Sequence, residues 1–218
     1  MTIDPSAVKI RTLIFDLDGT ISDPFEGISK SVNYALGELG YETVDPEQVR
    51  PMIGPPLTEI FAFLIGDVPE GHMQLLVDKY RERYASIGYR ENLIYDGIPE
   101  TIAALSTAGY RLGICTSKRA DYATSIVKMF GLSTHFRFIS GGDVGVHKSE
   151  QLEELVANGV DARTAAMIGD RHIDIEAAKS NGIMSVGVDW GFGADEELNL
   201  AAPDYRVRSP RELLDLFE

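Results

Sequence analysis

Short runs of apolar residues alternate along the chain with stretches whose apolar residues have helical spacing. In one such stretch, Ile98, Ile102 and Leu105 fall on one helix face, with Pro99 in the first turn and Gly109 just past the end. This alternation is typical of an α/β domain with a parallel sheet. The runs that predict strands are residues 12–15, 111–115, 136–139, 165–168 and 184–188, with 205–207 as a candidate edge strand.

The segment from about Ser22 to about Asp96 breaks this rhythm, because it is too long for one crossover connection. Its content is helical: one apolar stripe belongs to a helix that begins near Phe25, and a second stripe follows later. The stripes are Ile28, Val32, Ala35, Leu36 and Leu39, then Leu76, Val77, Tyr80, Tyr84 and Ile87. We therefore predict an α/β fold with a three-layer, Rossmann-like core and a parallel sheet (residues 1–24 and 96–218), plus an inserted α-helical cap domain (residues 25–95).

Composition narrows the possible partners. The 218 residues include 20 Lys+Arg and 34 Asp+Glu, so the formal net charge is −14. Because phosphate polymers are bound by surplus Lys and Arg, this balance argues against a nucleic acid polymer or an anionic membrane as partner. The single cysteine, Cys115, excludes an intramolecular disulfide framework and is expected to be a small buried hydrophobe. With no targeting or membrane-spanning segment in the sequence, we expect a cytoplasmic enzyme or binding protein.

Two carboxylates follow the first predicted strand in the run Phe15-Asp16-Leu17-Asp18-Gly19-Thr20. Ligands of open α/β sheets bind at the carboxyl ends of strands, which is where these acids lie. Side chains two residues apart in an extended segment point the same way, so the acids would converge unless a cation lay between them. The pattern Asp-x-Asp-Gly also occurs in turns and calcium loops. A calcium loop, however, needs further oxygen ligands at fixed spacing and does not follow a buried strand.

A second acidic cluster follows the predicted strand at residues 165–168. Asp170 lies at the strand end, and Asp174 begins the next helix. Taken alone, Asp174 reads as a helix cap, because Asp is a favoured cap residue. Together with Asp16 and Asp18, these residues supply hard oxygen ligands, which suit Mg²⁺ and poorly suit Zn²⁺. The sequence therefore predicts a magnesium site.

At these residues the chain resembles the haloacid dehalogenase-like superfamily of phosphatases. Phe15-Asp16-Leu17-Asp18-Gly19-Thr20 is similar to the first family motif, and Gly169-Asp170 through Asp174 is similar to the fourth. Thr116 matches the hydroxyl residue of the second motif, and Lys148 matches the lysine of the third. Taken alone, Thr116 reads as a buried hydroxyl at a strand end and Lys148 as a surface lysine, but both stand in the family order.

The chemistry of these groups indicates two roles. A carboxylate can attack phosphorus when a metal shields its charge, so Asp16 is expected to be the nucleophile and to form an aspartyl-phosphate. Asp18 would protonate the leaving alkoxide and then take a proton from the hydrolytic water. A dehalogenase expels halide, which needs no proton. The acid at position 18 therefore favours a phosphate ester over an alkyl halide as substrate.

The resemblance implies the remaining roles. Mg²⁺ would be held by the carboxylates of Asp16 and Asp170 and by the backbone carbonyl of Asp18. Asp174 would either support these ligands or reach the metal through water. Thr116 would donate a hydrogen bond to a phosphoryl oxygen, and Lys148 would neutralise the phosphoryl group and the nucleophile.

The resulting prediction is a Mg²⁺-dependent phosphomonoesterase that acts on a small phosphorylated metabolite. Similarity to a phosphoglycolate phosphatase and 5′-nucleotidase branch favours a nucleoside monophosphate, with phosphoglycolate as the alternative. A phosphomutase shares the four motifs but uses a cap histidine, for which the predicted cap offers only His72. A binding protein without activity would not need Asp18. In the cap, residues 53–57 and Phe25 are candidates for contacting the leaving group and selecting the substrate. Phe25 or Phe61 could stack on a base, but the core of the cap is the favoured place for both.

Overall fold

The computed structural model of the chain describes residues 9–69, 71–142 and 146–217. Six parallel strands form one sheet in the order β5-β4-β1-β6-β7-β8. The chain moves from β1 to one edge of the sheet and then returns to build the other edge, which is the Rossmann-like strand order. All six predicted strands are confirmed, and three extend further at their carboxyl ends. Their bounds are β1 (Thr12–Phe15), β4 (Arg111–Thr116), β5 (Phe136–Gly141), β6 (Ala165–Gly169), β7 (Met184–Val188) and β8 (Tyr205–Val207).

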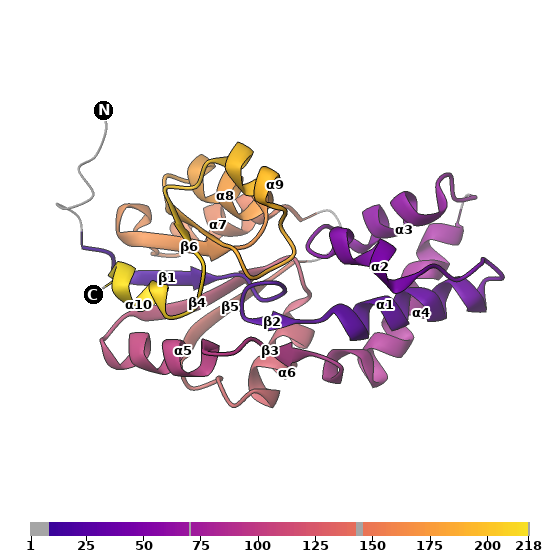
Figure 1. The fold of residues 1–218 in the computed structure, drawn as a ribbon, viewed down its shortest axis with the longest axis horizontal. Coiled ribbons are helices and arrows are strands. Elements are labelled where there is room, and N and C mark those ends of the chain that lie inside the picture. The colour runs from indigo at the N-terminus through magenta and orange to yellow at the C-terminus, as the bar shows by residue number, and fades with distance from the viewer. Residues whose placement is uncertain (1–8, 70, 143–145, 218) are drawn as a thin grey trace.

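Helices cover both faces of the sheet, so the predicted three layers are confirmed (Figure 1). In β1, Leu13 and Phe15 pack in the cluster with Ile98 of α5, whereas Ile14 packs on the opposite face with Leu152 of α7. Among the described residues, no helix is both long and apolar enough to cross a membrane. The helices are α5 (Ile98–Thr107), α6 (Ala120–Met129), α7 (Lys148–Ala157), α8 (His172–Ser180), α9 (Asp195–Ala201) and α10 (Glu212–Phe217), with the short turn η4 (Ala162–Thr164).

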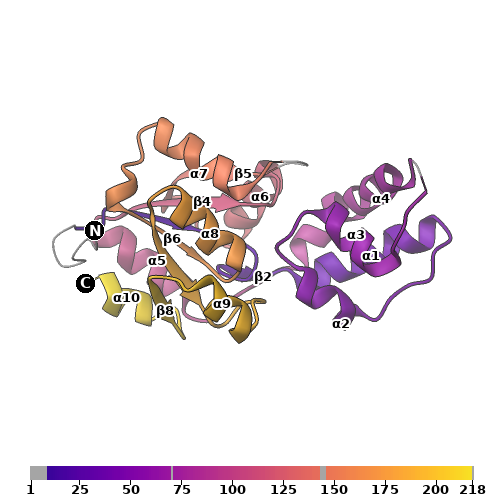
Figure 2. The same cartoon turned by 90° about the horizontal axis from the view of Figure 1, so that it is seen from above.

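A helical insertion lies beside the sheet (Figure 2), on the side toward which β1 points (Figure 1). It has its own hydrophobic cluster, in which Val32 of α1, Phe61 of α3 and Leu76 of α4 are fully buried. Its elements are α1 (Phe25–Glu38), α2 (Pro46–Val49), η2 (Arg50–Met52), α3 (Leu57–Ile65), α4 (His72–Ser86) and η3 (Gly88–Arg90). The chain leaves and re-enters the sheet region through a short antiparallel pair, β2 (Ser22–Asp23) with β3 (Leu93–Ile94).

One detail of the predicted helices is wrong. Ile87 is not part of the second apolar stripe, because α4 ends at Ser86 and the side chain of Ile87 is 47% exposed. The chain turns there into η3, where Gly88 packs against the ring of Tyr84 and leaves no room for a Cβ. The domain boundaries at residues 25 and 95 stay a prediction.

Candidate active site

The first pair of acids lies where β1 ends. The N–H of Asp16 donates to the carbonyl of Ile168 in β6 at 2.8 Å, which continues the parallel ladder to the carboxyl edge of the sheet. The chain then folds back on itself, since the N–H of Ser22 donates to the carbonyl of Leu17 at 3.0 Å. Asp16 and Asp18 are both buried, at 3% and 9% exposure. The turn therefore holds two carboxylates away from bulk water at the end of a central strand.

Asp170 lies at the end of the neighbouring strand β6 and is fully buried. Its two oxygens are held by the β1 turn and by the loop after β7: Thr20 Oγ1 donates to Oδ1 at 3.2 Å, and the N–H of Phe192 donates to Oδ2 at 2.8 Å. Asp174, in the first turn of α8, accepts the N–H of Arg171 on Oδ2 at 3.0 Å. Asp174 is thus not the N-cap residue itself, which is Arg171, but its carboxylate accepts the backbone N–H of that residue from the third position of the helix.

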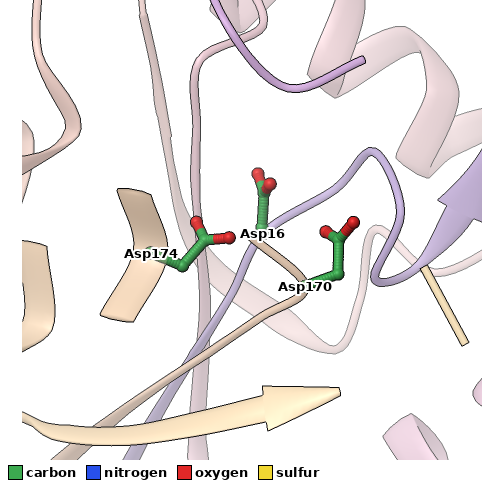
Figure 3. Close-up of side chains that lie close together, drawn as sticks. All are labelled: Asp16, Asp170 and Asp174. Atoms are coloured by element: carbon green, nitrogen blue, oxygen red, sulfur yellow. The ribbon is translucent and has the colours of Figure 1, made fainter. Parts of the chain in front are cut away.

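Asp16, Asp170 and Asp174 come together as one cluster, with a ligand oxygen from each lying within 4.8 Å of the others (Figure 3). Burial, together with the charges of Asp174 and Asp16, raises the pKa of Asp170 to about 8. Burial likewise raises the pKa of Asp174 to about 6, although Lys148 opposes that rise. Oδ1 of Asp16 is buried and has no hydrogen-bond partner among the described residues. Three buried carboxylates with an unpartnered oxygen suit a hard divalent cation, so this cluster could hold a metal ion.

Lys148 is the cation next to this cluster. It begins α7, is 5% exposed, lies 3.1 Å from Oδ2 of Asp16 and also pairs with Asp174. Burial lowers the pKa of Lys148, but the two carboxylates outweigh burial and raise it above the ordinary value. The lysine therefore stays charged and balances part of the negative charge of Asp16 and Asp174.

Asp18 has a separate cationic partner, Lys118, which was not among the predicted site residues. Lys118 lies in the loop after β4, and its Nζ is 2.6 Å from Oδ2 of Asp18. The same Nζ donates to the hydroxyl of Tyr84 in α4 at 2.8 Å. Burial raises the pKa of Asp18, and although Lys118 opposes this effect, the net shift is upward. A carboxyl group with a raised pKa is suited to act as a general acid near neutral pH.

Thr116 ends β4 and is 2% exposed. Its Oγ1 accepts the N–H of Lys118 at 3.3 Å, and its side chain lines the same pocket as Asp16 and Asp18. The neighbouring Cys115 is fully buried in the hydrophobic cluster that contains Ile14 and Leu152. Burial raises the pKa of its thiol to about 12. Cys115 is therefore a buried hydrophobe, as expected, whereas Thr116 faces the site.

The helical insertion forms the other wall of this pocket. Of the residues expected to read the leaving group, Gly54, Pro55, Pro56 and Leu57 line it. By contrast, Phe25 packs in the hydrophobic cluster of the insertion, with the guanidinium of Arg50 3.8 Å from its ring centroid. Phe61 is fully buried in the same cluster. Phe61 is thus confirmed in the core of the insertion, and Phe25 packs against that core.

Arg171 connects the end of β6 to the insertion. It follows Asp170 directly, and its Nη1 donates to the carbonyl of Ile53. Glu197 of α9 accepts from Nε of Arg171 at 2.8 Å and from the N–H of His172 at 2.9 Å. Glu197 belongs to the acidic first turn of α9, and it is half-buried and paired. Nothing in the local sequence signals this contact, because it depends on the packing of α9 against α8.

Comparison with known proteins identifies the family of the chain. The sequence profile described as "haloacid dehalogenase-like hydrolase" matches residues 13–188. The chain is 38% identical over 204 residues to a 5′-nucleotidase from Pseudomonas aeruginosa, covering 92% of each chain. It is 31% identical over 221 residues to a phosphoglycolate phosphatase from Aquifex aeolicus, covering 96% of this chain and 97% of that one. The crystal structure of a predicted phosphatase from Clostridium acetobutylicum matches with a TM-score of 0.89 and 32% identity, over 95% of this chain and 98% of that one. With these motifs, this strand order and these relatives, the chain belongs to the haloacid dehalogenase-like hydrolases and is a phosphatase of that family.

Proposed function

We propose that this phosphatase is a Mg²⁺-dependent 5′-nucleotidase that works through an aspartyl-phosphate on Asp16. The observation that carries the reaction class is the cluster of Asp16, Asp170 and Asp174, with Lys148 against the nucleophile and an unpartnered oxygen on Asp16. A buried carboxylate with one free oxygen and a cation beside the other is suited to attack phosphorus.

The residues that would hold Mg²⁺ are Asp16, Asp170 and, through its backbone carbonyl, Asp18. Both oxygens of Asp174 have partners, Lys148 and the N–H of Arg171, which supports a role beside the metal ligands. When bound, Mg²⁺ would shield the charge of the nucleophile from that of the phosphoryl oxygens. Lys148 would balance the charge on the same side, and Thr116 would donate its hydroxyl to a phosphoryl oxygen.

The reaction would then proceed in two displacements. In the first, a carboxylate oxygen of Asp16 forms a bond to phosphorus while the ester P–O bond breaks, and Asp18 gives its proton to the leaving alkoxide. In the second, Asp18 takes a proton from water, the water oxygen attacks phosphorus, and the acyl-phosphate bond breaks to release phosphate and free Asp16. The raised pKa of Asp18, which follows from burial, supports its role as the acid of the first displacement.

The substrate preference rests on the pocket wall. We treat residues 25–95 as a cap domain that covers the leaving group. Besides the acids, the lining of the pocket includes apolar and aromatic residues: Ile28, Leu57, Ile60 and Tyr80 of the cap and Tyr122 of the core. Such a wall suits a nucleoside, whose base and sugar offer apolar surface, better than it suits glycolate. The 5′-nucleotidase among the relatives supports the same choice.

Phosphoglycolate remains the second candidate because Arg81 and Arg119 line the same pocket. A guanidinium group can bind a substrate carboxylate through paired hydrogen bonds, and the relative from Aquifex aeolicus is named for this substrate. For either substrate, the cytoplasmic location stays a prediction from the sequence.

The test is a phosphate-release assay of the purified protein with Mg²⁺ on nucleoside 5′-monophosphates, phosphoglycolate and sugar phosphates. We expect the highest kcat/KM on a nucleoside monophosphate. Asp16→Asn should lower kcat by on the order of a thousandfold or more, while Asp78→Asn, on an exposed face of α4, should leave it unchanged. If activity is highest on phosphoglycolate, the proposed substrate is phosphoglycolate and not a nucleotide. If Asp16→Asn lowers kcat by less than about tenfold, Asp16 is not the nucleophile.

A further inference from the structure

Lys118 lies between the two parts of the molecule and contacts both. Its Nζ is 2.6 Å from Oδ2 of Asp18, which follows β1, and 2.8 Å from the hydroxyl of Tyr84, which belongs to α4 of the insertion. The side chain of Lys118 is 7% exposed and that of Asp18 is 12% exposed. Three segments far apart in the sequence therefore meet at one buried ammonium group.

Tyr84 is held rigidly at this meeting point. It is 2% exposed, its ring stacks on Tyr80 with centroids 5.3 Å apart, and Tyr122 of α6 packs edge-on against it at 5.2 Å. Gly88 closes the remaining side, since a Cβ there would lie 2.8 Å from the Tyr84 ring. A hydroxyl fixed in this way sets the position of Nζ of Lys118 through their hydrogen bond.

Asp16 and Asp18 have similar surroundings, because each has a lysine next to one of its two carboxylate oxygens. Lys148 is next to Oδ2 of Asp16, and Lys118 is next to Oδ2 of Asp18. Oδ1 of each acid is buried and has no hydrogen-bond partner among the residues that the structure describes. The lysine thus occupies one oxygen of Asp18 and leaves the other available to a leaving group in the pocket.

We propose that Lys118 is a positioning residue that orients Asp18 toward the leaving group, and that Tyr84 of the insertion holds Lys118 in place. The proposal rests on the proposed function, because it takes Asp18 as the general acid. The hydrogen bond from Lys118 to Tyr84 makes the placement of the acid depend on the insertion lying against the core. The competing role for Lys118 is direct binding of the phosphoryl group.

The test compares leaving groups. An alkoxide needs a proton from Asp18, whereas p-nitrophenolate leaves without one. Lys118→Gln should therefore lower kcat on a nucleoside monophosphate by about a hundredfold, the scale of general acid catalysis, and kcat on p-nitrophenyl phosphate by less than about fivefold. Tyr84→Phe should show the same selectivity at about fivefold, the scale of one lost hydrogen bond. Lys118→Arg should restore part of the nucleotide activity, since it keeps the charge.

Tyr34→Phe is the matched control, because Tyr34 is in the same insertion and loses a hydroxyl bonded to Glu82 on the surface. It should leave both substrates unchanged. Equal losses on both substrates in Lys118→Gln would overturn the positioning role and assign Lys118 to the phosphoryl group. Unchanged nucleotide turnover in Tyr84→Phe would refute the claim that Tyr84 of the insertion holds Lys118 in place. This result can be read even if Lys118→Gln does not fold. Asp18→Asn tests the underlying function separately: full nucleotide turnover in that variant would refute Asp18 as acid whatever Lys118 does.

Discussion

The backbone of Gly19 lies directly against the carboxylate of Asp170, so that a Cβ at position 19 would stand 2.6 Å from Oδ1 of Asp170. Gly19 also has a φ of +86°, which favours glycine over other residues. The turn after β1 and the end of β6 are therefore packed together with no side chain between them. This close approach brings Asp16 and Asp170 into one cluster.

Gly19→Ala should consequently damage both stability and metal binding. The left-handed backbone alone costs ~1 kcal/mol for alanine, and the methyl group must in addition displace the Asp170 carboxylate. Gly109→Ala is the matched control: Gly109 has a φ of +93°, but among the described residues nothing lies within 4 Å of its Cβ position. Both variants should lose Tm in a thermal melt. Only Gly19→Ala should also lose phosphatase activity, and equal activity in the two variants would contradict the close approach.

Phosphatase activity should require Mg²⁺, and Ca²⁺ should not substitute for it. Calcium takes more ligands at longer distances, so it would change how the carboxylate of Asp16 is bound and spoil its attack. We expect EDTA to abolish phosphate release, added Mg²⁺ to restore it, and added Ca²⁺ to fail. Mg²⁺ should also raise Tm, by the equivalent of ~2.7 kcal/mol at a hundred times its Kd. Full turnover in the presence of chelator would remove the metal from the mechanism.

Without metal, the stability of the protein should fall as pH rises. Burial and the neighbouring carboxylates raise the pKa of Asp170 from its ordinary value of 3.8 to about 8. Between these values the folded protein keeps a proton that the unfolded chain has lost, so the stability contributed at low pH disappears as pH approaches 8. In EDTA, Tm should therefore be lower at pH 8 than at pH 5. Asp170→Asn does not titrate and should show a smaller fall; an equal fall would assign the pH dependence to other groups.

The sequence could predict the acids at strand ends because their position follows from the chain itself. Asp16 comes directly after a buried apolar strand, and Asp170 follows another. Parallel strands in one sheet bring such positions to a shared edge. The prediction needed only the strand pattern, and all six predicted strands are present in the structure.

Lys118 could not be found in the same way. It lies in a polar loop two residues after Thr116, where a lysine is ordinarily exposed. Its burial depends on Tyr84 and Asp18, which come from other parts of the chain. The periodicity of a helix shows which face is apolar but not which neighbour that face meets. The side chain of Phe25 was open to two interpretations for the same reason.

Two substitutions in the insertion should have different effects, one on stability and one on substrate preference, because the two apolar residues have different surroundings. Both Phe25 and Leu57 pack against the hydrophobic cluster of the insertion, but Leu57 also lines the pocket, whereas Phe25 lies under the guanidinium of Arg50. Phe25→Ala should lower the free energy of unfolding by about 2 kcal/mol and affect all substrates alike. Leu57→Ala removes a contact to the part of the substrate that does not react, and such contacts orient the reacting group. It should lower kcat/KM on nucleoside monophosphates by about tenfold while kcat/KM on p-nitrophenyl phosphate changes little.

The measurement is the ranking of substrates by kcat/KM for both variants, together with their melting curves. An unchanged ranking in Leu57→Ala would refute the insertion as the reader of the leaving group and, with it, the preference for a nucleotide substrate.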